Sequence, residues 1–423
     1  MLRSVGNRGR SDSSRVDAAA PRRPRDGDHG GRGADPDDER RAAAYRSAMD
    51  EIPAGPLRRG WTTGTCAAAA AKAAYAALLG GEFPDPVAVT LPGGARPSFA
   101  LAVHSRADGS ATAGVVKDAG DDPDVTHGAL VLATVRRAAP GAGVVFRAGE
   151  GVGIVTRAGL PLPVGEPAIN PVPRRMIAQA IGEVAAAHGE PGDVEVEIGV
   201  ENGAALALRT LNPRLGILGG LLILGTTGIV VPYSCAAWIH SIHRGIDVAR
   251  AAGLDHVAGA TGSTSEAAVQ RLHDLPEIAL IDMGDFVGGM LKYLRVRPVA
   301  RVTVAGGLAK MTKLAQGMLD LHSKRGAVDL EGLAALATAA GGSPDLAASI
   351  VASNTAMEAF GHAAAAGIGL GDAVAAAARA TAAAVVAKAG IDFEVVVFGR
   401  DGGLVGRAGF AGEDDAAHVP PPR

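Results

Sequence analysis

Small and hydroxyl-bearing residues follow a short apolar segment in the second half of the chain, residues 256–260. If that segment is a strand and a helix begins directly after it, the first N–H groups of the helix lack partners within the helix and can bind a carboxylate or a phosphate. Any turn between a strand and a helix favours Gly and Ser, so the pattern also fits an ordinary connection. The residues concerned are Gly259, Thr261, Gly262, Ser263 and Thr264.

A carboxylate, Asp282, lies twenty residues after Gly262 at the end of the next apolar segment. In nucleotide-binding α/β proteins, a carboxylate at this position accepts hydrogen bonds from the ribose hydroxyl groups. The spacing therefore favours a cofactor that carries an adenosine, although the complete glycine fingerprint is absent. Asp285 has a simpler interpretation, since it precedes a predicted helix that begins at Phe286 and suits the N-cap position.

Four carboxylates lie within seven residues in the first half of the chain, in the segment Lys-Asp-Ala-Gly-Asp-Asp-Pro-Asp at residues 117–124. Carboxylates that are close together can bind a cation or transfer protons. The spacing does not match a calcium-binding loop. The alternative is an acidic turn in which Asp124 caps a following helix, and the spacing by itself favours this structural interpretation.

Cationic side chains occur in predicted loops of both halves, where they could bind a substrate that carries several carboxylates. Surface solubility explains any one of them equally well. His240 and His243 have the i, i+3 spacing of metal ligands on a helix, which also fits two unrelated histidines on a solvated helix, and His322 is similarly ambiguous. The cations are Arg157, Arg174, Lys310 and Lys313.

The elements that must position these residues change in type along the chain. In residues 55–231, a Thr-Thr-Gly-Thr sequence before an alanine run predicts a helix start, and residues 173–188 predict a second helix. Residues 86–113 alternate as in hairpin strands, with turns at residues 92–94 and 108–109. This part is predicted to be an α+β domain with largely antiparallel strands. Residues 232–411 alternate strand, turn and helix, which predicts a parallel, Rossmann-like α/β domain with Ala-rich helices. Ligands bind such sheets at the carboxyl ends of the strands.

Composition places the chain among globular proteins and excludes several classes of function. With 423 residues, two domains are expected, and residues 1–54 and 412–423 are predicted to be disordered tails because they contain few large apolar side chains. A net charge of −3 gives no reason to expect nucleic acid as a partner. The most apolar run, residues 217–231, is too short and too rich in glycine for a membrane span. No export signal is visible near residue 1, and the 2 cysteines suit a reducing cytoplasm.

Several segments, taken in order, resemble the cobalt-precorrin-5B (C1)-methyltransferase family between residues 57 and 409. The first is Arg-Arg-Gly-Trp-Thr-Thr-Gly-Thr-Cys at residues 58–66, and the acidic segment at 116–126 is the second. One segment departs from the family, which usually has Gly-His-Pro-Gly-Lys where this chain has Gly-Gly-Leu-Ala-Lys at residues 306–310, and the departure that matters is Gly307 in place of a histidine. The other similar segments are residues 151–157, 166–174, 212–220, 225–231 and 285–291.

This resemblance implies transfer of a methyl group from S-adenosylmethionine to C1 of the corrin precursor. The products would be cobalt-precorrin-6A and S-adenosylhomocysteine, in the oxygen-independent cobalamin route. Cobalt would then enter only as part of the substrate, and no metal site of the protein is expected. The resemblance also implies a cytoplasmic enzyme that acts on a small molecule. Association with itself or with other enzymes of the pathway is left open.

Roles follow for the residues singled out above. The adenosine of the methyl donor is expected at residues 259–264 and at Asp282. A base that removes a proton from the macrocycle would assist the reaction, and the candidates are Asp118 and Asp124. Two other classes of function remain, a nicotinamide-dependent reductase of the corrin precursor and a carrier that binds it without catalysis. The substrate carboxylates are expected at Arg157, Arg174, Lys310, Lys313 and His322.

Overall fold

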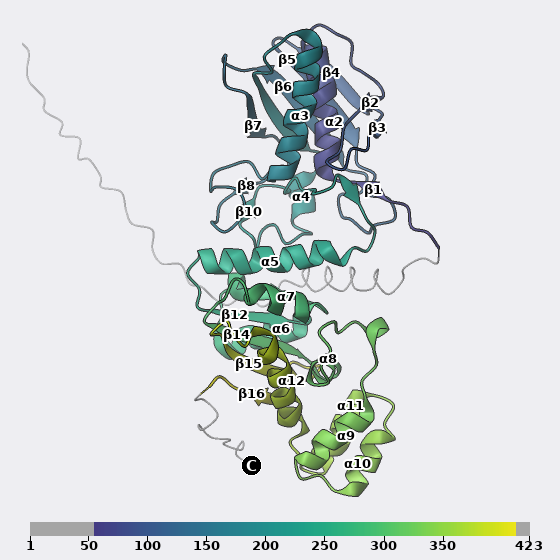
Figure 1. The fold of residues 1–423 in the computed structure, drawn as a ribbon, viewed down its shortest axis with the longest axis vertical. Coiled ribbons are helices and arrows are strands. Elements are labelled where there is room, and N and C mark those ends of the chain that lie inside the picture. Colours follow the sequence, from purple (N-terminus) through teal and green to yellow (C-terminus); the bar gives the residue numbers. More distant parts are fainter. Residues whose placement is uncertain (1–54, 412–423) are drawn as a thin grey trace, which may run out of the picture. The chain divides into compact units, whose positions relative to one another are not determined.

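The computed structural model describes residues 55–411, and the predicted tails, residues 1–54 and 412–423, lie outside this range. Two five-stranded sheets organise the described residues, one within residues 103–200 and one within residues 256–408 (Figure 1). Each sheet has a hydrophobic core of its own. The boundary between two domains at residue 231 remains a prediction.

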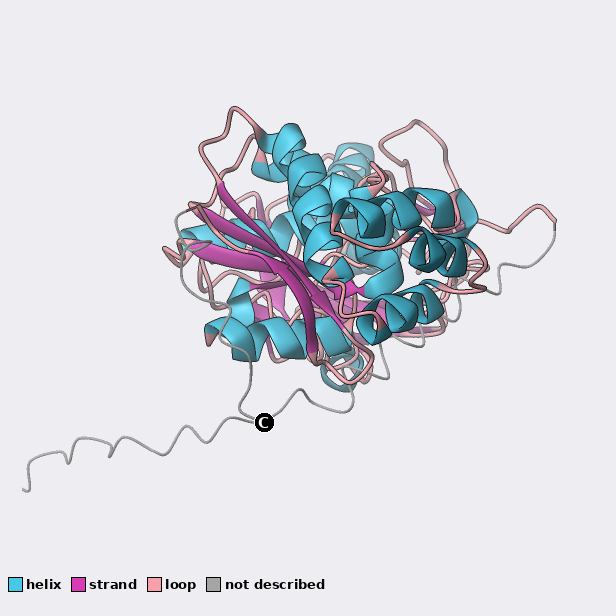
Figure 2. Ribbon diagram, turned by 90° about the horizontal axis from the view of Figure 1, so that it is seen from below, coloured by secondary structure: helices cyan, strands magenta, loops and turns pink. Residues whose placement is uncertain are grey.

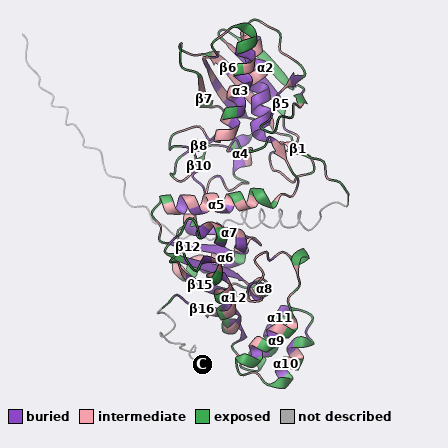
Figure 3. Cartoon of the chain, viewed as in Figure 1, coloured by how far each residue is buried: buried purple, intermediate pink, exposed green. Residues whose placement is uncertain are grey.

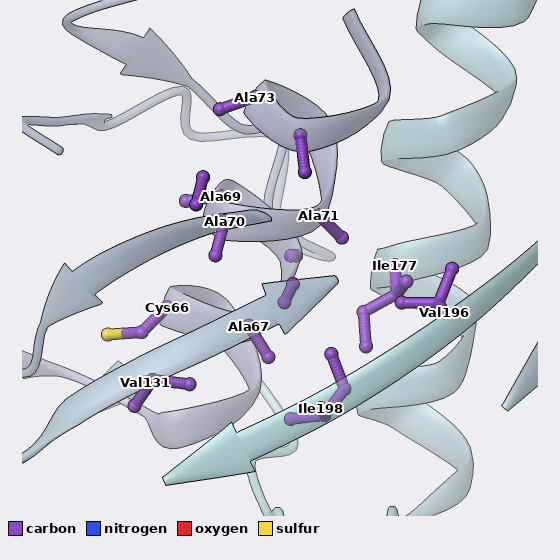
Figure 4. Close-up of a cluster of buried hydrophobic side chains, with 14 of the residues drawn as sticks. Cys66, Ala67, Ala69, Ala70, Ala71, Ala73, Val131, Ile177, Val196 and Ile198 are labelled. Atoms are coloured by element: carbon purple, nitrogen blue, oxygen red, sulfur yellow. The ribbon is translucent and has the colours of Figure 1, made fainter. Parts of the chain in front are cut away.

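Helix α2 (Thr63–Leu78) is the central helix of the first part. Thr62 caps it by accepting a hydrogen bond from a first-turn N–H, as the hydroxyl before the alanine run predicts. Helix α3 (Pro171–His188) packs beside it and begins two residues earlier than predicted, because prolines 171 and 173 both fit the first turn. Figure 4 shows the alanines of α2 packed against Ile177 of α3 and against the strands of the first sheet. The small alanine side chains allow this close approach.

The first sheet has the strand order β4-β5-β6-β9-β7. Its pairs are antiparallel except β7 with β9, so the predicted antiparallel character is confirmed. Strand β6 follows the acidic segment, so the interpretation in which Asp124 caps a helix is wrong. The strands are β4 (Val103–Ala107), β5 (Ser110–Val116), β6 (Leu130–Arg137), β7 (Val144–Ala148) and β9 (Val194–Val200).

Short two-stranded pairs complete the first part. Strands β1 (Gly60–Trp61) and β11 (Ile229–Val230) are antiparallel, which brings the segments 58–66 and 225–231 together. The most apolar run, residues 217–231, contains two such short strands, one at each end. The remaining elements are β2 (Val87–Ala88) paired with β3 (Ser98–Phe99), β8 (Ile154–Val155) paired with β10 (Ile217–Leu218), and the short helix α4 (Gly203–Ala207).

The second sheet has the order β13-β12-β14-β15-β16. Strands β13, β12, β14 and β15 are parallel and β16 is antiparallel to β15, so the predicted parallel sheet is confirmed. Its more specific description as Rossmann-like stays a prediction. Strands β15 and β16, which the sequence pattern could not assign to either sheet, belong to this second sheet. The strands are β12 (His256–Ala260), β13 (Leu280–Asp282), β14 (Arg301–Gly307), β15 (Asp392–Phe398) and β16 (Leu404–Ala408).

Successive residues of these strands point to opposite faces of the sheet and meet different helices. Ala258 and Ala305 pack with helix α6 (Ser263–His273), whereas Val257 and Val304 belong to the larger cluster on the other face. Figure 2 shows helices on both sides of the strands, and Figure 3 shows buried residues concentrated in these layers. The other helices are α5 (Cys235–Ala251), η1 (Glu277–Ala279), α7 (Val287–Leu294), α8 (Leu308–Ala315), η2 (Ser323–Arg325), α9 (Leu330–Ala339), α10 (Pro344–Val351), α11 (Ala356–Ala365) and α12 (Leu370–Val386). Within residues 55–411, every helix is too short or too polar to cross a bilayer.

Candidate functional site

The connections of the second sheet create a topological switch point between β12 and β14. From β12 the chain passes through α6 to β13 on one side, and then through α7 back to β14 on the other side of β12. The loops after β12 and β14 therefore leave in opposite directions, and ligands of open α/β sheets bind in the crevice that results. The residues predicted to hold the adenosine, together with Gly307, lie at or near the carboxyl ends of these strands.

Close packing accounts for two of the glycines at this edge. A side chain at Gly259 would meet two methionine sulfur atoms, and a Cβ at Gly306 would lie 2.9 Å from Thr261 Oγ1. By contrast, a Cβ at Gly307 would meet nothing within 4 Å, and the φ of −74° at this position suits any residue. The edge therefore has open space at the position where a histidine is usual in the family that the sequence resembles.

Helix α6 places its first turn at the same edge. Its N-cap residue, Gly262, has no side chain to occupy the first N–H groups, and Thr264 is exposed while Ser263 is half-buried. The Ser265 hydroxyl donates a 2.8 Å hydrogen bond to the Gly262 carbonyl, which holds the turn in place. The first-turn N–H groups can therefore bind an anion or the polar groups of a ligand.

Asp282 ends β13 and is half-buried. In the parallel pairing of β12 with β13 it lies opposite Ala260, the residue directly before Thr261. Its backbone carbonyl accepts a 3.0 Å hydrogen bond from the indole Nε1 of Trp238 in α5. The carboxylate predicted for a ribose thus lies beside the predicted small-residue turn, which is the geometry that the sequence spacing requires.

Arg214 also contacts this region and was not among the predicted site residues. Its guanidinium donates two hydrogen bonds of 3.2 Å to Glu266 in the first turn of α6, and one of 2.9 Å to the Leu280 carbonyl. Burial lowers the pKa of Arg214, but the charges of Glu266, Asp282 and Glu277 raise it overall. The signal that could have found Arg214 is its place in the family-like segment at residues 212–220.

Lys310 and Lys313, predicted to bind substrate carboxylates, have partners within the protein. Lys310 forms an ion pair with Asp285 and donates a 3.1 Å hydrogen bond to the Leu321 carbonyl. Lys313 is buried and donates to the same carbonyl at 3.3 Å, and its burial and the Lys310 charge lower its pKa. Asp285 does not cap α7, whose N-cap is Phe286, so the capping interpretation is wrong.

The other predicted substrate-binding residues also contact the protein itself. Arg157 donates a 2.9 Å hydrogen bond to a backbone carbonyl, and Arg174 donates one of 2.9 Å to Glu166. His322 accepts a 3.1 Å hydrogen bond from the Lys324 N–H through Nδ1. Arg157 and Arg174 lie in the first part of the chain, whereas Lys310, Lys313 and His322 cluster after β14. Their role toward a substrate stays a prediction.

The acidic segment is organised around Lys117, whose side chain is 1% exposed. Its ammonium group pairs with Asp124 and contacts the Thr126 hydroxyl at 2.5 Å. Asp124 also accepts hydrogen bonds from the Thr126 N–H at 2.7 Å and from the Thr126 hydroxyl at 2.6 Å. Burial raises the pKa of Asp124, but the charge of Lys117 and these hydrogen bonds outweigh it, so the pKa is lowered overall.

Asp118 connects two of the segments that resemble the family, residues 58–66 and 116–126, because it pairs with Arg58. The Arg58 guanidinium donates to both of its carboxylate oxygens, one of them at 3.0 Å, and the Gly120 N–H adds a bond of 2.9 Å. The hydrogen bond from Arg58 is the main reason why the pKa of Asp118 falls to about 2. Asp118 and Asp124, the two predicted bases, thus lie in one loop and both stay ionised in ion pairs. Their catalytic role stays a prediction.

A hollow of about 520 Å³ opens beside this loop. Asp122 lies in its lining, and its Oδ1 accepts a 2.7 Å hydrogen bond from the backbone N–H of Tyr233. Burial raises the pKa of Asp122, as does the Asp124 charge, against the opposing effects of the Tyr233 N–H and Lys117. The pKa of Asp122 is therefore shifted in the opposite direction to those of Asp118 and Asp124, and sequence reasoning did not distinguish this carboxylate. The other polar residues of the lining are Asp121, Asp124, His127, Arg209 and Tyr233.

Of the two histidines with metal-ligand spacing, His243 packs against an aromatic ring and His240 is exposed. His243 stacks on Tyr293 with ring centroids 3.9 Å apart and an angle of 11° between the planes, and its burial lowers its pKa. The ring of His240 lies 6.4 Å from that of His243. In the part of the chain that the structure describes, no group of three or more His, Cys, Asp or Glu side chains is arranged to hold a metal ion.

Comparisons with known proteins match the family that the sequence segments resemble. A family model described as CbiD matches residues 51–232, and one described as CbiD, C-terminal domain, matches residues 320–409. The cobalt-precorrin-5B C(1)-methyltransferase of Agrobacterium fabrum is 64% identical over 351 residues, which are 83% of this chain and 93% of that protein. The protein of the same name from Methylorubrum extorquens is 65% identical over 83% of this chain and 97% of its own length.

A solved structure gives a weaker match. It is the crystal structure of a cobalamin biosynthesis protein (CbiD) from Archaeoglobus fulgidus, which is 27% identical to this chain. The match covers 64% of this chain and 84% of that one, with a TM-score of 0.36.

Proposed function

This chain belongs to the CbiD family, and on that basis we propose that it methylates C1 of cobalt-precorrin-5B with S-adenosylmethionine as the methyl donor. The observation that carries the proposal is the identity of 64% and 65% with two C(1)-methyltransferases, over 93% and 97% of their lengths. The cobalt belongs to the substrate.

The reaction forms a carbon–carbon bond at C1 and breaks the bond between sulfur and the methyl carbon, whose electron pair stays on sulfur. S-adenosylmethionine supplies the methyl group in an electrophilic, sulfonium-bound form. The macrocycle loses one proton in exchange, which balances the charge. The protein therefore has to align two ligands, exclude water and accept a proton.

Residues at the carboxyl edge of the second sheet suit the methyl donor. The first-turn N–H groups of Ser263 and Thr264 would bind its polar groups, and Asp282 would accept hydrogen bonds from its ribose. The open space at Gly307 leaves room for a ligand over the edge. This use of the sheet would be Rossmann-like, because the strand order β13-β12-β14-β15-β16 corresponds to the 2-1-3-4-5 order of doubly wound folds that bind ligands at this switch point.

The decisive experiment is incubation of the protein with cobalt-precorrin-5B and methyl-labelled S-adenosylmethionine, followed by mass analysis. We expect one labelled methyl group in the macrocycle, located at C1. An unlabelled macrocycle would contradict the proposal. If the macrocycle is bound but not methylated, the carrier alternative is favoured, and a fluorescence change with a reduced nicotinamide nucleotide would favour the reductase alternative.

The placement of the donor has a separate test. Asp282→Asn should weaken binding of S-adenosylmethionine about tenfold, measured by calorimetry, because a neutral amide accepts ribose hydrogen bonds less well. The matched control is Asp274→Asn at the opposite end of α6, where the left-handed backbone at φ 48° tolerates asparagine. Equal affinity of the two variants would rule out this placement.

We further propose that the reaction takes place in the cytoplasm. Cys66 is buried and Cys235 is exposed, and both are free thiols, which agrees with a reducing compartment. Association of the chain with itself or with other enzymes of the pathway stays a prediction, and size measurement in solution would test it.

A further inference from the structure

The hollow of about 520 Å³ beside the acidic loop is not used by the placement of the methyl donor. Its polar lining consists of three carboxylates, an imidazole, a guanidinium and a phenol, contributed by Asp121, Asp122, Asp124, His127, Arg209 and Tyr233. Val125 adds an apolar surface. Leu208 and Val231, next to Arg209 and near Tyr233 in the chain, are 59% and 50% exposed. Arg209 is the cation of this lining that can pair with a carboxylate of a ligand, and the apolar residues can contact its ring system.

The carboxylates of the loop differ in the ion pairs and hydrogen bonds that they form with other residues of the protein. Asp118 and Asp124 are each held by a cation and by further hydrogen bonds. Asp121 is exposed and accepts a 2.6 Å hydrogen bond from the Arg58 N–H. Asp122 is half-buried and has no cation within ion-pair distance among the described residues. It therefore has the acceptor capacity that a proton-transfer group needs, in a less solvated position than Asp121.

Chain connectivity keeps this hollow near the edge proposed for the methyl donor. Tyr233 donates to Asp122, and Trp238, five residues later, donates to the carbonyl of Asp282. Five residues span at most about 18 Å, and the stretch is shorter here because α5 begins at Cys235. A macrocycle in the hollow and a methyl donor at the sheet edge can therefore approach each other.

We infer that the hollow receives the reacting edge of the corrin precursor, that Asp122 accepts the proton which the macrocycle loses during methylation, and that Arg209 pairs with a peripheral carboxylate of the substrate. This inference rests on the proposed methyl transfer. In the step, the carbon–carbon bond to C1 forms as the sulfur–methyl bond breaks, and the proton released by the macrocycle passes to an oxygen of Asp122. Bulk water then removes that proton, which restores the carboxylate.

The raised pKa of Asp122 supports this role, because a base whose pKa lies closer to the working pH accepts a proton more effectively than one held far below it. Lys117 has a positioning role in the same scheme. By pairing with Asp124 it closes the loop on which Asp122 is presented to the hollow.

The test compares Asp122→Asn with Asp108→Asn, which removes an equal charge from an exposed turn of the same part of the chain. Asparagine can still accept the Tyr233 hydrogen bond, so folding should be retained. We expect kcat for methyl transfer to fall about 10²- to 10³-fold in Asp122→Asn. The affinity for S-adenosylmethionine should be unchanged, and Asp108→Asn should match the unmodified enzyme.

Separate outcomes distinguish this inference from the proposed function. If the unmodified enzyme does not methylate the macrocycle, the proposed function fails. If it does, and Asp122→Asn retains more than half of kcat, the assignment of Asp122 is wrong. Should Asp122→Asn unfold, Asp122→Glu replaces it, and a pH–rate profile identical to that of the unmodified enzyme would overturn the assignment. For Arg209→Gln we expect a KM for the corrin precursor about tenfold higher with kcat retained, and an unchanged KM would remove Arg209 from the site.

Discussion

The backbone N–H of Tyr233 donates a 2.7 Å hydrogen bond to Oδ1 of Asp122, although the two residues are 111 positions apart. Tyr233 has a φ of 56°, in the left-handed region that non-glycine residues rarely adopt. The contact joins the acidic loop of the first part to the segment that leads into α5. It places the carboxylate proposed as the proton acceptor next to the chain that continues toward the second sheet.

The left-handed backbone at Tyr233 predicts an unusual order of stability for two variants. Tyr233→Gly and Tyr233→Ala both lose the phenol and keep the N–H. Glycine adopts a positive φ without steric cost, so we expect the glycine variant to be more stable than the alanine variant by about 1 kcal/mol. Urea unfolding of both proteins checks this. A more stable alanine variant would mean that Tyr233 does not have this backbone conformation in solution.

Gly306 and Gly307 are neighbours with opposite tolerance to substitution. At Gly306 a Cβ would lie 2.5 Å from Met311 Cε and 2.9 Å from Thr261 Oγ1, whereas at Gly307 it would meet nothing within 4 Å. We expect Gly306→Ala to lose about 1–3 kcal/mol of stability by overpacking, and Gly307→Ala and Gly307→His to stay within about 0.5 kcal/mol of the parent. Thermal unfolding of the three variants measures this. Equal losses at both positions would contradict the open space at Gly307.

The buried Lys117–Asp124 pair is expected to be essential for folding of the acidic loop. Lys117→Met leaves the Asp124 carboxylate without its cation in a largely buried position, which should cost about 2–4 kcal/mol. The double variant Lys117→Met with Asp124→Asn should recover part of this loss, because no unpaired charge remains. Arg137→Met is the control, since its pair with Glu190 lies on the surface and its loss should be much smaller. Equal effects of Lys117→Met and Arg137→Met would contradict the structural role of Lys117.

The lowered pKa of the buried His256 predicts that the folded protein loses stability in mild acid. Its ring is buried and contacts the Thr303 hydroxyl at 2.8 Å, and burial, with the charges of His273 and Arg301, lowers its pKa to about 4. Between about pH 6.5 and pH 4 the unfolded chain therefore binds a proton that the folded chain does not, so stability is full above pH 6.5 and falls as the pH falls toward 4. The expected loss is on the order of 1–3 kcal/mol.

The measurement for His256 is urea unfolding at pH 7, 5 and 4. His256→Gln keeps a hydrogen-bonding side chain opposite Thr303 but does not titrate, so its stability should change less over this range. Glu394, buried between His273 and Arg407, has a lowered pKa and loses its stabilising charge only at lower pH. The same pH dependence in the parent and in His256→Gln would show that His256 is not the responsible group.

Local patterns were sufficient to predict many elements of this fold. The Thr62 hydroxyl before the alanine run predicted the start of α2, because capping and helix propensity act within one turn. The turn residues Asp108 and Gly109 within the alternating segment 86–113 predicted a hairpin there, which the β4–β5 pair confirms. The spacing of Gly262 and Asp282 placed them together at one edge of a parallel sheet, since both depend on the regular geometry of a strand–helix–strand unit.

The caps assigned to Asp124 and Asp285 were wrong for a common reason. Both side chains bind lysines instead, Lys117 from the preceding strand end and Lys310 from α8, and charge pairing exceeds the local preference for a cap. The position of β15 and β16 in the second sheet was also beyond the sequence pattern. Strand β15 pairs with β14 across the intervening residues 308–391, and this pairing depends on packing that no local window contains.

The sequence by itself determined the family, the change from a largely antiparallel first part to a parallel second sheet, and the presence of four carboxylates in one short loop. Only the tertiary structure decided what each carboxylate does. Arg58, sixty residues away in the chain, forms an ion pair with Asp118, and Lys117 forms one with Asp124. Asp122 instead accepts a hydrogen bond from the Tyr233 N–H and lies half-buried beside a hollow. The physical reason is that protonation depends on burial and on nearby charges, and these are set by chain segments that meet only in the folded protein.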